Sequence, residues 1–489
     1  MRLSELLNGI TVIKYNASFD ENIEYIANDH RRVTLNSIFV AIKGTKRNGN
    51  DYIEEAIQNG ATVIITDEIY KCKMSLPYVL VKDAREALAK LWSNFYKNPA
   101  KSLKTVAITG TNGKTSTAFI LYSILKASRI SCGLISTIGT YINEKKIEID
   151  GGGSLSDVSS AMTTPDPEYL YFLYNKMKEN GVKIVVIEAS SHALYQKRLS
   201  AIDVDIAVFT NLTREHLDFH RNMDEYFSAK KLLFEKCKTG IVNIDNRYGK
   251  EIKNNFKNIY GCSKKEKSEF YAENIQNYSN CSEFQFFGSG INLKIKTNLV
   301  GEFNVSNIIL ATACAVILGI EDKAIETGVS QIERINGRLE RYGNRNIYID
   351  YAHTPTAMEK VISTIKEIHH EKRVIVLFGC GGDRDKGKRA EMGEICSKLA
   401  DYTVITSDNS RTEDPKDIIK DILSGIDKNK HFAIIEDRKK AIKQVVSDMD
   451  DNDVLLLLGK GHEEYEITRE GKTRFSEKDI LDEVLNLDK

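Results

Sequence analysis

Short apolar runs alternate with amphipathic stretches of helical period along most of this chain, and this alternation is the strongest constraint on its fold. An apolar run predicts a buried strand, and an amphipathic stretch between two such runs predicts the helix that connects two parallel strands. We therefore predict an α/β protein with parallel sheets and crossover helices. The predicted strands cover residues 105–109, 183–189, 205–212, 240–245, 346–350, 373–379, 402–407 and 454–459.

The same alternation divides the chain into three predicted domains. Residues 1–98 form a smaller α/β block with predicted strands at 37–42 and 61–66. The block ends in the polar segment Tyr96-Lys97-Asn98-Pro99, which we interpret as a linker into a central domain at 99–336. Strands and helices begin again after Asn336-Gly337-Arg338, which indicates a C-terminal domain at 337–489. Three domains agree with a chain of 489 residues.

The composition excludes several classes of function. Lys plus Arg and Asp plus Glu number 69 each, so no broad basic surface indicates nucleic-acid binding. No apolar run reaches the roughly 20 residues that a membrane span needs. The N-terminus MRLSELLN lacks the apolar stretch and cleavage site of a secretion signal, so we expect a cytoplasmic protein. The eight cysteines are scattered without a C-x-x-C pair, which argues against a zinc site and a disulfide framework.

A glycine-rich loop follows the predicted strand at 105–109 and opens a predicted helix around 118–125. Its backbone N–H groups and the helix N-terminus can surround phosphate, its lysine can reach the β- and γ-phosphates, and its threonine hydroxyl suits magnesium. The loop is shorter than the usual P-loop, because Ile108 occupies the position of the first glycine. A plain glycine turn would not require Lys and Thr after the second glycine. We predict an ATP or GTP site at Gly110, Thr111, Asn112, Gly113, Lys114, Thr115 and Ser116.

Together with this loop, a series of short segments resembles the Mur ligase family. The segments occur in family order: TTP (163–165), EASSH (188–192), FTNLTREHLD (209–218), AK (229–230), GEFNVSN (301–307), GRLE (337–340) and DYAH (350–353). Two later segments, DNSR (408–411) and GKGHE (459–463), resemble the MurE branch of that family.

The resemblance implies a fold and a reaction. The fold would have an N-terminal UDP-precursor-binding domain, a central P-loop ATPase domain with a parallel sheet, and a Rossmann-like C-terminal domain that binds an amino acid. The reaction would be ATP-dependent ligation of a diamino acid to UDP-N-acetylmuramoyl-L-alanyl-D-glutamate through an acyl phosphate, in peptidoglycan precursor synthesis. A carboxylate must be phosphorylated before an amine can attack its carbon and displace phosphate, and cations must offset the repulsion between ATP and that carboxylate.

The resemblance also assigns metal and catalytic residues. Mg2+ would be held by Thr115, Glu188, His216 and a carbamylated Lys230, and the catalytic set would be Lys114, Lys230, Glu188 and His216. Considered alone, His216 also fits a surface helix cap, and Lys230 also fits a solvated helical face. Glu188 follows an apolar strand and would need a partner if buried.

Further residues are assigned to the substrates by the same resemblance. Asn307, Arg338 and Asp350 would contact the rest of ATP, although Arg338 alone also fits a surface salt bridge. His30 stands where the family usually has serine in an Asp-Ser-Arg segment. The precursor contacts would be Asp29, His30, Thr163, Thr164, Ser190, Gln196 and Arg198.

The incoming amino acid would be meso-diaminopimelate, because Arg411 is kept where lysine-adding members tend to replace arginine. A guanidinium suits the second carboxylate of that amino acid. Ser410 replaces the proline of the usual Asp-Asn-Pro-Arg and removes a fixed φ. The amino-acid-binding residues would be Arg384, Asp408, Asn409, Arg411, Gly459 and Glu463.

Two other interpretations stay open. His30 and Ser410 also fit a Mur-like ligase acting on another carrier, of the pseudomurein, cyanophycin or folyl-polyglutamate type. A nucleotide-binding partner protein without catalysis is the third hypothesis, and intact Lys114, Glu188, His216 and Lys230 argue against it. Small-molecule substrates and a monomer are expected in the leading interpretation.

Overall fold

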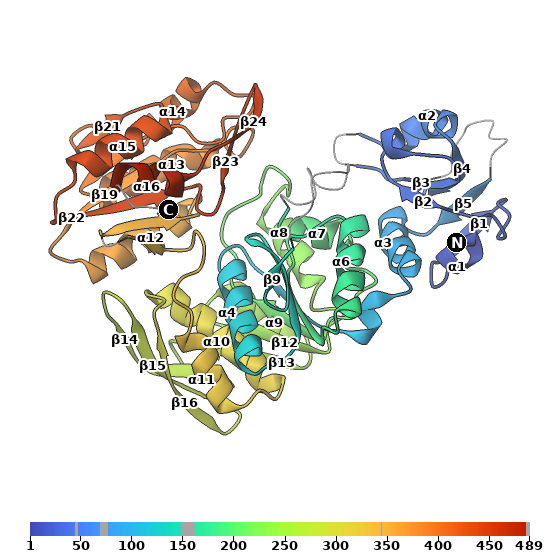
Figure 1. The fold of residues 1–489 in the computed structure, drawn as a ribbon, viewed down its shortest axis with the longest axis horizontal. Coiled ribbons are helices and arrows are strands. Elements are labelled where there is room, and N and C mark those ends of the chain that lie inside the picture. Colours follow the sequence, from blue (N-terminus) through green and yellow to red (C-terminus); the bar gives the residue numbers. More distant parts are fainter. Residues whose placement is uncertain (45–46, 69–76, 148–161, 344, 486–489) are drawn as a thin grey trace. The chain divides into compact units, whose positions relative to one another are not determined.

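The computed structural model describes residues 1–44, 47–68, 77–147, 162–343 and 345–485 of the chain (Figure 1). The chain forms two compact units, each made of several segments. The first comprises Met1–Thr109, Arg129–Val208 and Ser228–Gly240, and the second comprises Gly110–Ser128, Phe209–Phe227 and Ile241–Lys489.

The first unit begins with a five-stranded sheet in the order β1-β5-β4-β3-β2. Strands β2 to β5 pair in parallel, as the alternating pattern predicts, and β1 joins the edge in the antiparallel sense. Phe39, Ala56 and Ile64 are part of its buried core. The elements are α1 (Leu3–Leu6), β1 (Val12–Tyr15), β2 (Tyr25–Ala27), η1 (His30–Arg32), β3 (Ser37–Ala41), η2 (Gly49–Tyr52), α2 (Ile53–Gln58), β4 (Ala61–Thr66), β5 (Tyr78–Val81), α3 (Ala84–Phe95) and η3 (Pro99–Ser102).

The first unit continues with β6, the strand that leads into the glycine-rich loop. β6 pairs in parallel with β10, and β10 with β7, while β8 and β9 extend β7 in the antiparallel sense. Parallel pairing brings the carboxyl ends of these strands to one edge, where ligands of such folds collect. The elements are β6 (Lys104–Thr109), β7 (Cys132–Ser136), β8 (Gly139–Ile142), β9 (Lys145–Lys146), α6 (Pro167–Glu179), β10 (Ile184–Glu188), α7 (Ser191–Tyr195), β11 (Ile206–Phe209), α8 (Met223–Lys231) and β12 (Thr239–Asn243), of which the last three continue into the second unit.

In the second unit, helix α4 (Lys114–Ala127) starts at the glycine-rich loop and packs against α10 and α11. Nine of its residues are buried, because two helices cover it. An antiparallel group β14-β15-β16 continues from β13, which pairs in parallel with β14. The elements are α9 (Arg247–Asn255), β13 (Ile259–Ser263), β14 (Phe270–Asn277), β15 (Ser282–Gly288), β16 (Ile291–Thr297), α10 (Glu302–Ile317) and α11 (Asp322–Ser330).

The last part of the second unit is a six-stranded sheet in the order β17-β18-β22-β19-β20-β21. All pairs are parallel except that of β17 and β18. One core contains residues of α12, α13 and α14, and a second contains residues of α15 and α16, so helices cover both faces, as in a doubly wound fold. The elements are β17 (Glu340–Tyr342), β18 (Ile347–Asp350), α12 (Pro355–Ile368), β19 (Arg373–Phe378), α13 (Gly387–Leu399), β20 (Tyr402–Ile405), α14 (Pro415–Leu423), β21 (Phe432–Ile434), α15 (Arg438–Asp448), β22 (Asp453–Leu458), β23 (Tyr465–Thr468), β24 (Gly471–Arg474) and α16 (Glu477–Leu485).

The ten predicted strands are all present, with ends that differ by a few residues. The largest difference is at 205–212, where β11 already ends at Phe209 because the following residues turn to hold the glycine-rich loop. The antiparallel group β14-β15-β16 was not predicted. At the end of the predicted linker 96–99, Pro99 is buried and begins η3.

The part of the chain that the structure describes contains neither a membrane-spanning helix nor a disulfide bond. No helix there is both long and apolar enough to cross a membrane. The seven cysteines within the described ranges are free thiols, and Cys72 lies outside them.

Candidate active site

The glycine-rich loop forms the turn between β6 and α4. Gly110 and Gly113 have positive φ values of 149° and 87°. A Cβ at Gly110 would clash with the Thr210 hydroxyl, and one at Gly113 with the Asn307 side-chain oxygen. Lys114 Nζ donates to the carbonyls of Gly110 (3.0 Å) and Thr111 (2.8 Å), so its ammonium lies over the loop. This is the geometry of a phosphate-binding loop at a helix N-terminus.

The residues after β11 hold the loop in place. Thr210 Oγ1 donates to the Asn112 carbonyl at 2.6 Å, and Asn211 Nδ2 donates to the same carbonyl at 2.9 Å. In return, Asn112 N donates to Asn211 Oδ1 at 3.0 Å, and Thr111 N donates to the Asn211 carbonyl at 2.8 Å. Sequence reasoning assigned no role to Thr210 or Asn211, although both lie in the FTNLTREHLD segment.

The three residues predicted to contact the rest of ATP lie around the loop. Thr117 donates to Asn307 Oδ1 at 3.3 Å, and Arg338 Nη2 donates to Thr115 Oγ1 at 3.2 Å. Asp350 accepts from Leu339 N at 2.6 Å and from Ala352 N at 2.7 Å. Burial raises the pKa of Asp350 more than the nearby Arg338 lowers it. The structure therefore brings Asn307 and Arg338 to the phosphate loop, and Asp350 supports the backbone next to Arg338.

A chain of contacts connects Arg338 to the predicted amino-acid-binding residues. The Arg338 guanidinium lies 4.7 Å from the centre of the Tyr351 ring, and Tyr351 Oη donates to Glu463 Oε1 at 3.4 Å. Asn409 Nδ2 donates to Glu463 Oε2 at 2.8 Å. Tyr351 was not among the predicted site residues, although it lies in the DYAH segment.

Lys460 is a second residue that sequence reasoning missed, although it lies in the GKGHE segment. It is fully buried, and its Nζ donates to Asn409 Oδ1 (3.1 Å) and to the Tyr465 carbonyl (2.8 Å). Burial alone would raise the pKa of Asp408, but Lys460 and Arg438 hold that pKa below its ordinary value. Gly459 has φ 108°, and a Cβ there would approach the Asp408 carboxylate. The two predicted loops, 408–411 and 459–463, are therefore joined around one buried ammonium.

Arg411 and Arg384 have different surroundings. Arg411 Nη1 donates to the carbonyls of Gly382 (2.8 Å) and Asn409 (3.2 Å), and its Nε and Nη2 have no hydrogen-bond partner within the described ranges. Arg384 is half exposed and lies 3.8 Å from Asp218, in the FTNLTREHLD segment. The structure thus brings Arg411 to the other amino-acid-binding residues, whereas Arg384 pairs with a carboxylate of a different segment.

A buried carboxylate of the FTNLTREHLD segment, Glu215, contacts a histidine of the DYAH segment. Glu215, next to His216, lies 2.8 Å from His353 Nε2 and 3.8 Å from His216 Nε2. Burial opposes ionisation of Glu215, but His216 and His353 outweigh burial, so the pKa of Glu215 lies well below its ordinary value. Glu215 is therefore an anion held between two imidazoles.

In the first unit, five of the predicted precursor contacts lie in one hydrogen-bonded cluster. Thr164 Oγ1 donates to the Glu188 carbonyl at 2.7 Å and accepts from Ser190 N at 2.9 Å. Arg198 Nη1 donates to the Thr164 carbonyl (2.6 Å), and its Nη2 donates to Gln196 Oε1 (2.6 Å). The Glu188 carboxylate accepts from Thr137 N (2.9 Å) and Thr137 Oγ1 (3.2 Å), and Thr163 Oγ1 lies 3.0 Å from Thr137 Oγ1. Thr137 follows β7 and carried no sequence signal.

The other predicted precursor contacts, Asp29 and His30, lie at the 3-10 helix η1. The His30 ring stacks on Tyr52, with centres 4.5 Å apart and planes at 4°. The hydrogen bond from Arg31 lowers the pKa of Asp29 to about 2. Within the described part of the chain, no contact joins Asp29 or His30 to the Thr164 cluster.

Three of the four predicted metal ligands lie at or near the ends of helices or strands. Thr115 lies in the first turn of α4, Glu188 ends β10, and Lys230 lies in the last turn of α8. Glu188 and Lys230 are 0% and 1% exposed, so Lys230 does not lie on a solvated helical face. His216 has φ 56° and its ring lies edge-on to Tyr226, 5.9 Å between centres.

Comparison with known proteins covers almost the whole chain. Residues 22–96 match the description "Mur ligase family, catalytic domain", residues 108–315 match "Mur ligase middle domain", and residues 337–461 match "Mur ligase, glutamate ligase domain".

Individual relatives extend this match to both ends. The chain is 38% identical to UDP-N-acetylmuramoyl-L-alanyl-D-glutamate-2,6-diaminopimelate ligase 1 of Clostridium acetobutylicum, with 99% of each chain covered. It is 39% identical to the corresponding ligase of Caldanaerobacter subterraneus subsp. tengcongensis, again over 99% of each. A solved structure of a UDP-N-acetylmuramoyl-L-alanyl-D-glutamate-2,6-diaminopimelate ligase has a TM-score of 0.69 at 27% identity, over 99% of both chains. Because these similarities span the phosphate loop and the amino-acid loops alike, the chain belongs to the Mur ligase family.

Proposed function

We propose that this chain is an ATP-dependent ligase that adds meso-diaminopimelate to UDP-N-acetylmuramoyl-L-alanyl-D-glutamate through an acyl phosphate. The observation that carries the proposal is the continuous contact path from Thr115 through Arg338, Tyr351 and Glu463 to Asn409. It places the phosphate loop and the amino-acid loops in one compact unit. Relatives at 38% and 39% identity carry the name of this reaction.

The first step is transfer of the γ-phosphoryl group of ATP to the D-glutamyl carboxylate. Lys114 and Arg338 are the cations at the phosphate loop, and we assign to them the stabilisation of charge that develops on the transferred group. The amine of the incoming amino acid then attacks the acyl carbon, a C–N bond forms, and phosphate leaves. Catalysis in such a step is mainly positioning and electrostatics, which rigid loops at strand ends provide.

We further propose that Mg2+ is held by Thr115, Glu188, His216 and a carbamylated Lys230. The donor set is mainly oxygen, which Mg2+ prefers, provided that Lys230 contributes a carbamate. A carbamate on Lys230 would add a second anionic ligand beside the Glu188 carboxylate. When bound, the ion would neutralise phosphate charge.

The choice of amino acid rests on Arg411. Its Nη1 is occupied by two carbonyls, and its Nε and Nη2 remain as parallel donors among the described residues. A carboxylate accepts such a fork in bidentate fashion, and diaminopimelate has one more carboxylate than lysine. We assign Asp408, Asn409, Gly459 and Glu463 to the same site, with Arg384 at its edge.

For the precursor, we propose the Thr164 cluster and the segment around Asp29. Hydroxyls of Thr163, Thr164 and Ser190 with the Arg198 guanidinium suit pyrophosphate and sugar oxygens. His30 stacked on Tyr52 occupies the position of the usual serine. That stack is the one observation that favours a second candidate, a ligase of this family acting on a different carrier.

The test is phosphate release over a panel of UDP-linked acceptors and amino acids. We expect release to be fastest with ATP, UDP-N-acetylmuramoyl-L-alanyl-D-glutamate and meso-diaminopimelate together, and slower when lysine replaces diaminopimelate. Release with a carrier that lacks UDP would favour the second candidate, and no release with any combination would contradict the proposal. We further propose that the protein is a monomer in the cytoplasm, with domains at 1–98, 99–336 and 337–489. Light scattering tests the monomer, which should have the mass of one 55.2 kDa chain.

A further inference from the structure

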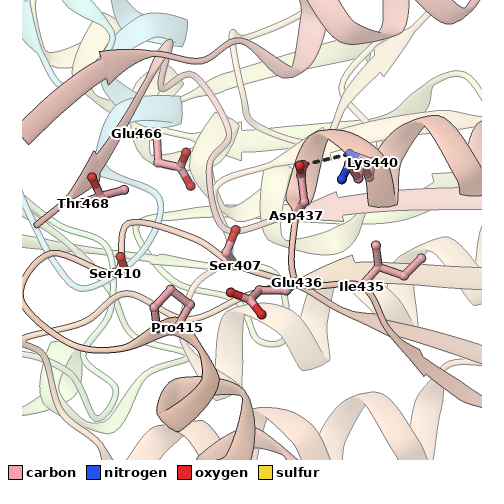
Figure 2. A pocket seen from close by; sticks show the side chains of 9 residues that line it. All are labelled: Ser407, Ser410, Pro415, Ile435, Glu436, Asp437, Lys440, Glu466 and Thr468. Atoms are coloured by element: carbon pink, nitrogen blue, oxygen red, sulfur yellow. Dashed lines mark hydrogen bonds between the residues drawn. The ribbon is translucent and has the colours of Figure 1, made fainter. Parts of the chain in front are cut away.

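A cavity of about 460 Å³ lies in the second unit, beside the loop that carries Arg411 (Figure 2). It opens near the carboxyl ends of β20 and β21, where Ser407, Ser410 and Glu436 line it, and Glu466 of β23 faces it. Such strand ends are common ligand sites in doubly wound sheets. Arg411, Asn409 and Glu463 do not line this cavity, so it is separate from the proposed amino-acid site.

Ser410 is the residue of this cavity that points to a ligand. It is 4% exposed, and its hydroxyl has no hydrogen-bond partner within the described part of the chain. Its backbone is fixed, because the Ser410 carbonyl accepts from Glu413 N at 3.0 Å and Asn409 O accepts from Gly382 N at 2.9 Å. The hydroxyl lines the cavity without a protein partner, so it can donate to or accept from a ligand there.

The lining is acidic. It contains three carboxylates, those of Glu436, Asp437 and Glu466, and one cation, Lys440 (Figure 2). Asp437 caps α15 by accepting from Lys440 N at 3.0 Å, whereas the carboxylates of Glu436 and Glu466 form no hydrogen bond or ion pair with any described side chain. Burial raises the pKa of Glu466, which indicates that its charge is incompletely compensated by Lys460 and Arg438. The cavity therefore favours a positively charged ligand.

The lining favours an organic cation over a metal ion. The carboxylates here do not form a metal-binding group of three or more side chains within the described ranges. Pro415 and Ile435 supply apolar wall for a carbon chain, and the hydroxyls of Ser410 and Thr468 supply acceptors. A primary ammonium has three donors, which one carboxylate and two hydroxyls can satisfy.

We propose that this cavity binds a free aliphatic diamine through one of its ammonium ends. Glu466 and Ser410 are its main contacts. The site is additional to the ligase reaction and does not depend on the proposed substrates.

The test is calorimetric titration of the full chain with 1,5-diaminopentane and with its uncharged analogue 1,5-pentanediol. We expect saturable, salt-sensitive binding of the diamine and none of the diol. Loss of one charge-assisted hydrogen bond should weaken diamine binding by about tenfold or more in Glu466→Gln, with a smaller loss in Ser410→Ala. Glu470→Gln, an exposed carboxylate change at the turn of the same hairpin, is the matched control and should bind like the unmodified chain.

Two further arms complete the experiment. Unchanged thermal unfolding midpoints would establish that Glu466→Gln and Ser410→Ala are folded. Diaminopentane binding that persists in Arg411→Ala and is lost in Arg411→Ala/Glu466→Gln would assign the diamine to this cavity rather than to the amino-acid site. Equal diamine binding by Glu466→Gln and Glu470→Gln, or equal binding of diol and diamine, would overturn the proposal whether or not the ligase function holds.

Discussion

At the scale of single residues, the phosphate loop depends on positions that cannot accept a side chain and on one that must have a cation. Gly110 and Gly113 combine positive φ with direct contact to Thr210 and Asn307, so any other residue there would push away a bracing side chain. Lys114 has its ammonium over the loop carbonyls rather than in the core. Its role should therefore be separable from folding.

Lys114→Ala should reduce ATP-dependent ligation by about a hundredfold or more, the usual cost of removing a group that stabilises transition-state charge. The unfolding midpoint should stay close to that of the unmodified chain. Phosphate release and thermal unfolding, measured side by side, check both points. Lys126→Ala, at the other end of α4, is the control and should remain active. Normal turnover by Lys114→Ala would refute the phosphate-site assignment.

Arg411→Ala should depress the use of meso-diaminopimelate much more than the use of lysine. The two amino acids differ by the carboxylate that Nε and Nη2 of Arg411 could bind, and a charge-assisted hydrogen bond is worth roughly 1.5–3 kcal/mol. That energy predicts about a ten- to hundredfold preference in the unmodified enzyme. The measurement is the ratio of the ligation rates with the two amino acids. Any strain from the φ of 52° at residue 411 affects both rates and cancels in this ratio. Equal or better use of lysine by the unmodified enzyme would show that Arg411 does not select the amino acid.

At the scale of elements, one buried ion pair joins two helices that pack on the C-terminal sheet. Arg438 of α15 is buried with Glu477 of α16, and its Nη2 lies 2.7 Å from Glu477 Oε1. The same guanidinium donates to the carbonyls of Leu458 (2.8 Å) and Ser407 (3.4 Å), which precede the two amino-acid loops. The pair therefore ties two helices to both loops.

Glu477→Ala should lower the free energy of unfolding by about 3 kcal/mol, because it leaves a buried guanidinium without its counterion. We expect the low end of the range for buried pairs, since Glu477 Oε2 has no hydrogen-bond partner among the described residues. Glu483→Ala is the matched control: Glu483 also lies on α16 and pairs with Lys439 and Lys443 of α15, but at the surface. Urea unfolding of both variants gives the comparison, and equal losses would contradict the prediction.

Glu413, in the loop before α14, should make stability depend on pH. Hydrogen bonds from Arg389 lower the pKa of Glu413 to about 2, against an ordinary value of 4.5. A lowered pKa in the folded state stabilises the protein above pH 4.5, and this stabilisation is lost as the pH falls towards 2. The difference in unfolding midpoint between the unmodified chain and Glu413→Gln should thus be largest near neutral pH and shrink in acid. A difference that stays constant with pH would show that Glu413 acts without its charge.

At the scale of the whole molecule, the proposed reaction draws on all three segments that match the family. The proposed precursor contacts lie in 22–96 and 108–315, and the proposed ATP contacts lie mainly in 108–315. The proposed amino-acid contacts lie in 337–461, except for Glu463, which follows shortly after that match. Lys230, which is buried on α8, is the residue whose chemistry tests the proposed reaction as a whole, because its carbamylation would supply an oxygen ligand for Mg2+.

Lys230→Ala should lose most ligase activity, and bicarbonate should not restore it. Small carboxylates such as acetate should restore part of the activity by replacing the carbamate as an oxygen ligand. Lys231→Ala is the control, since Lys231 is its neighbour in α8 and should be dispensable. The measurement is the ligation rate of Lys230→Ala with and without acetate. An active Lys230→Ala, or a crystal of the active enzyme with an unmodified Lys230 ammonium, would contradict carbamylation.

Local patterns in the sequence were enough for most of the fold and for the position of the phosphate loop. The strands β6, β10, β19 and β22 are apolar runs that are buried on both faces, and burial of that kind is visible in composition alone. The group β14-β15-β16 escaped prediction, because its alternating burial is mixed with polar residues such as Gln285 and Lys294. The loop at 110–116 was predictable because strand, glycines, lysine and helix are adjacent in the chain.

Only the tertiary structure decided which side chains support these segments. Thr137, Thr210 and Lys460 lie far along the chain from their partners Glu188, Asn112 and Asn409, and no local spacing encodes such pairs. Hydrogen bonds and buried charges are satisfied by whatever the fold brings near, which depends on the packing of the whole unit. The sequence by itself thus determined the elements and the chemically active loop, whereas long-range packing determined how that loop and the amino-acid loops are held.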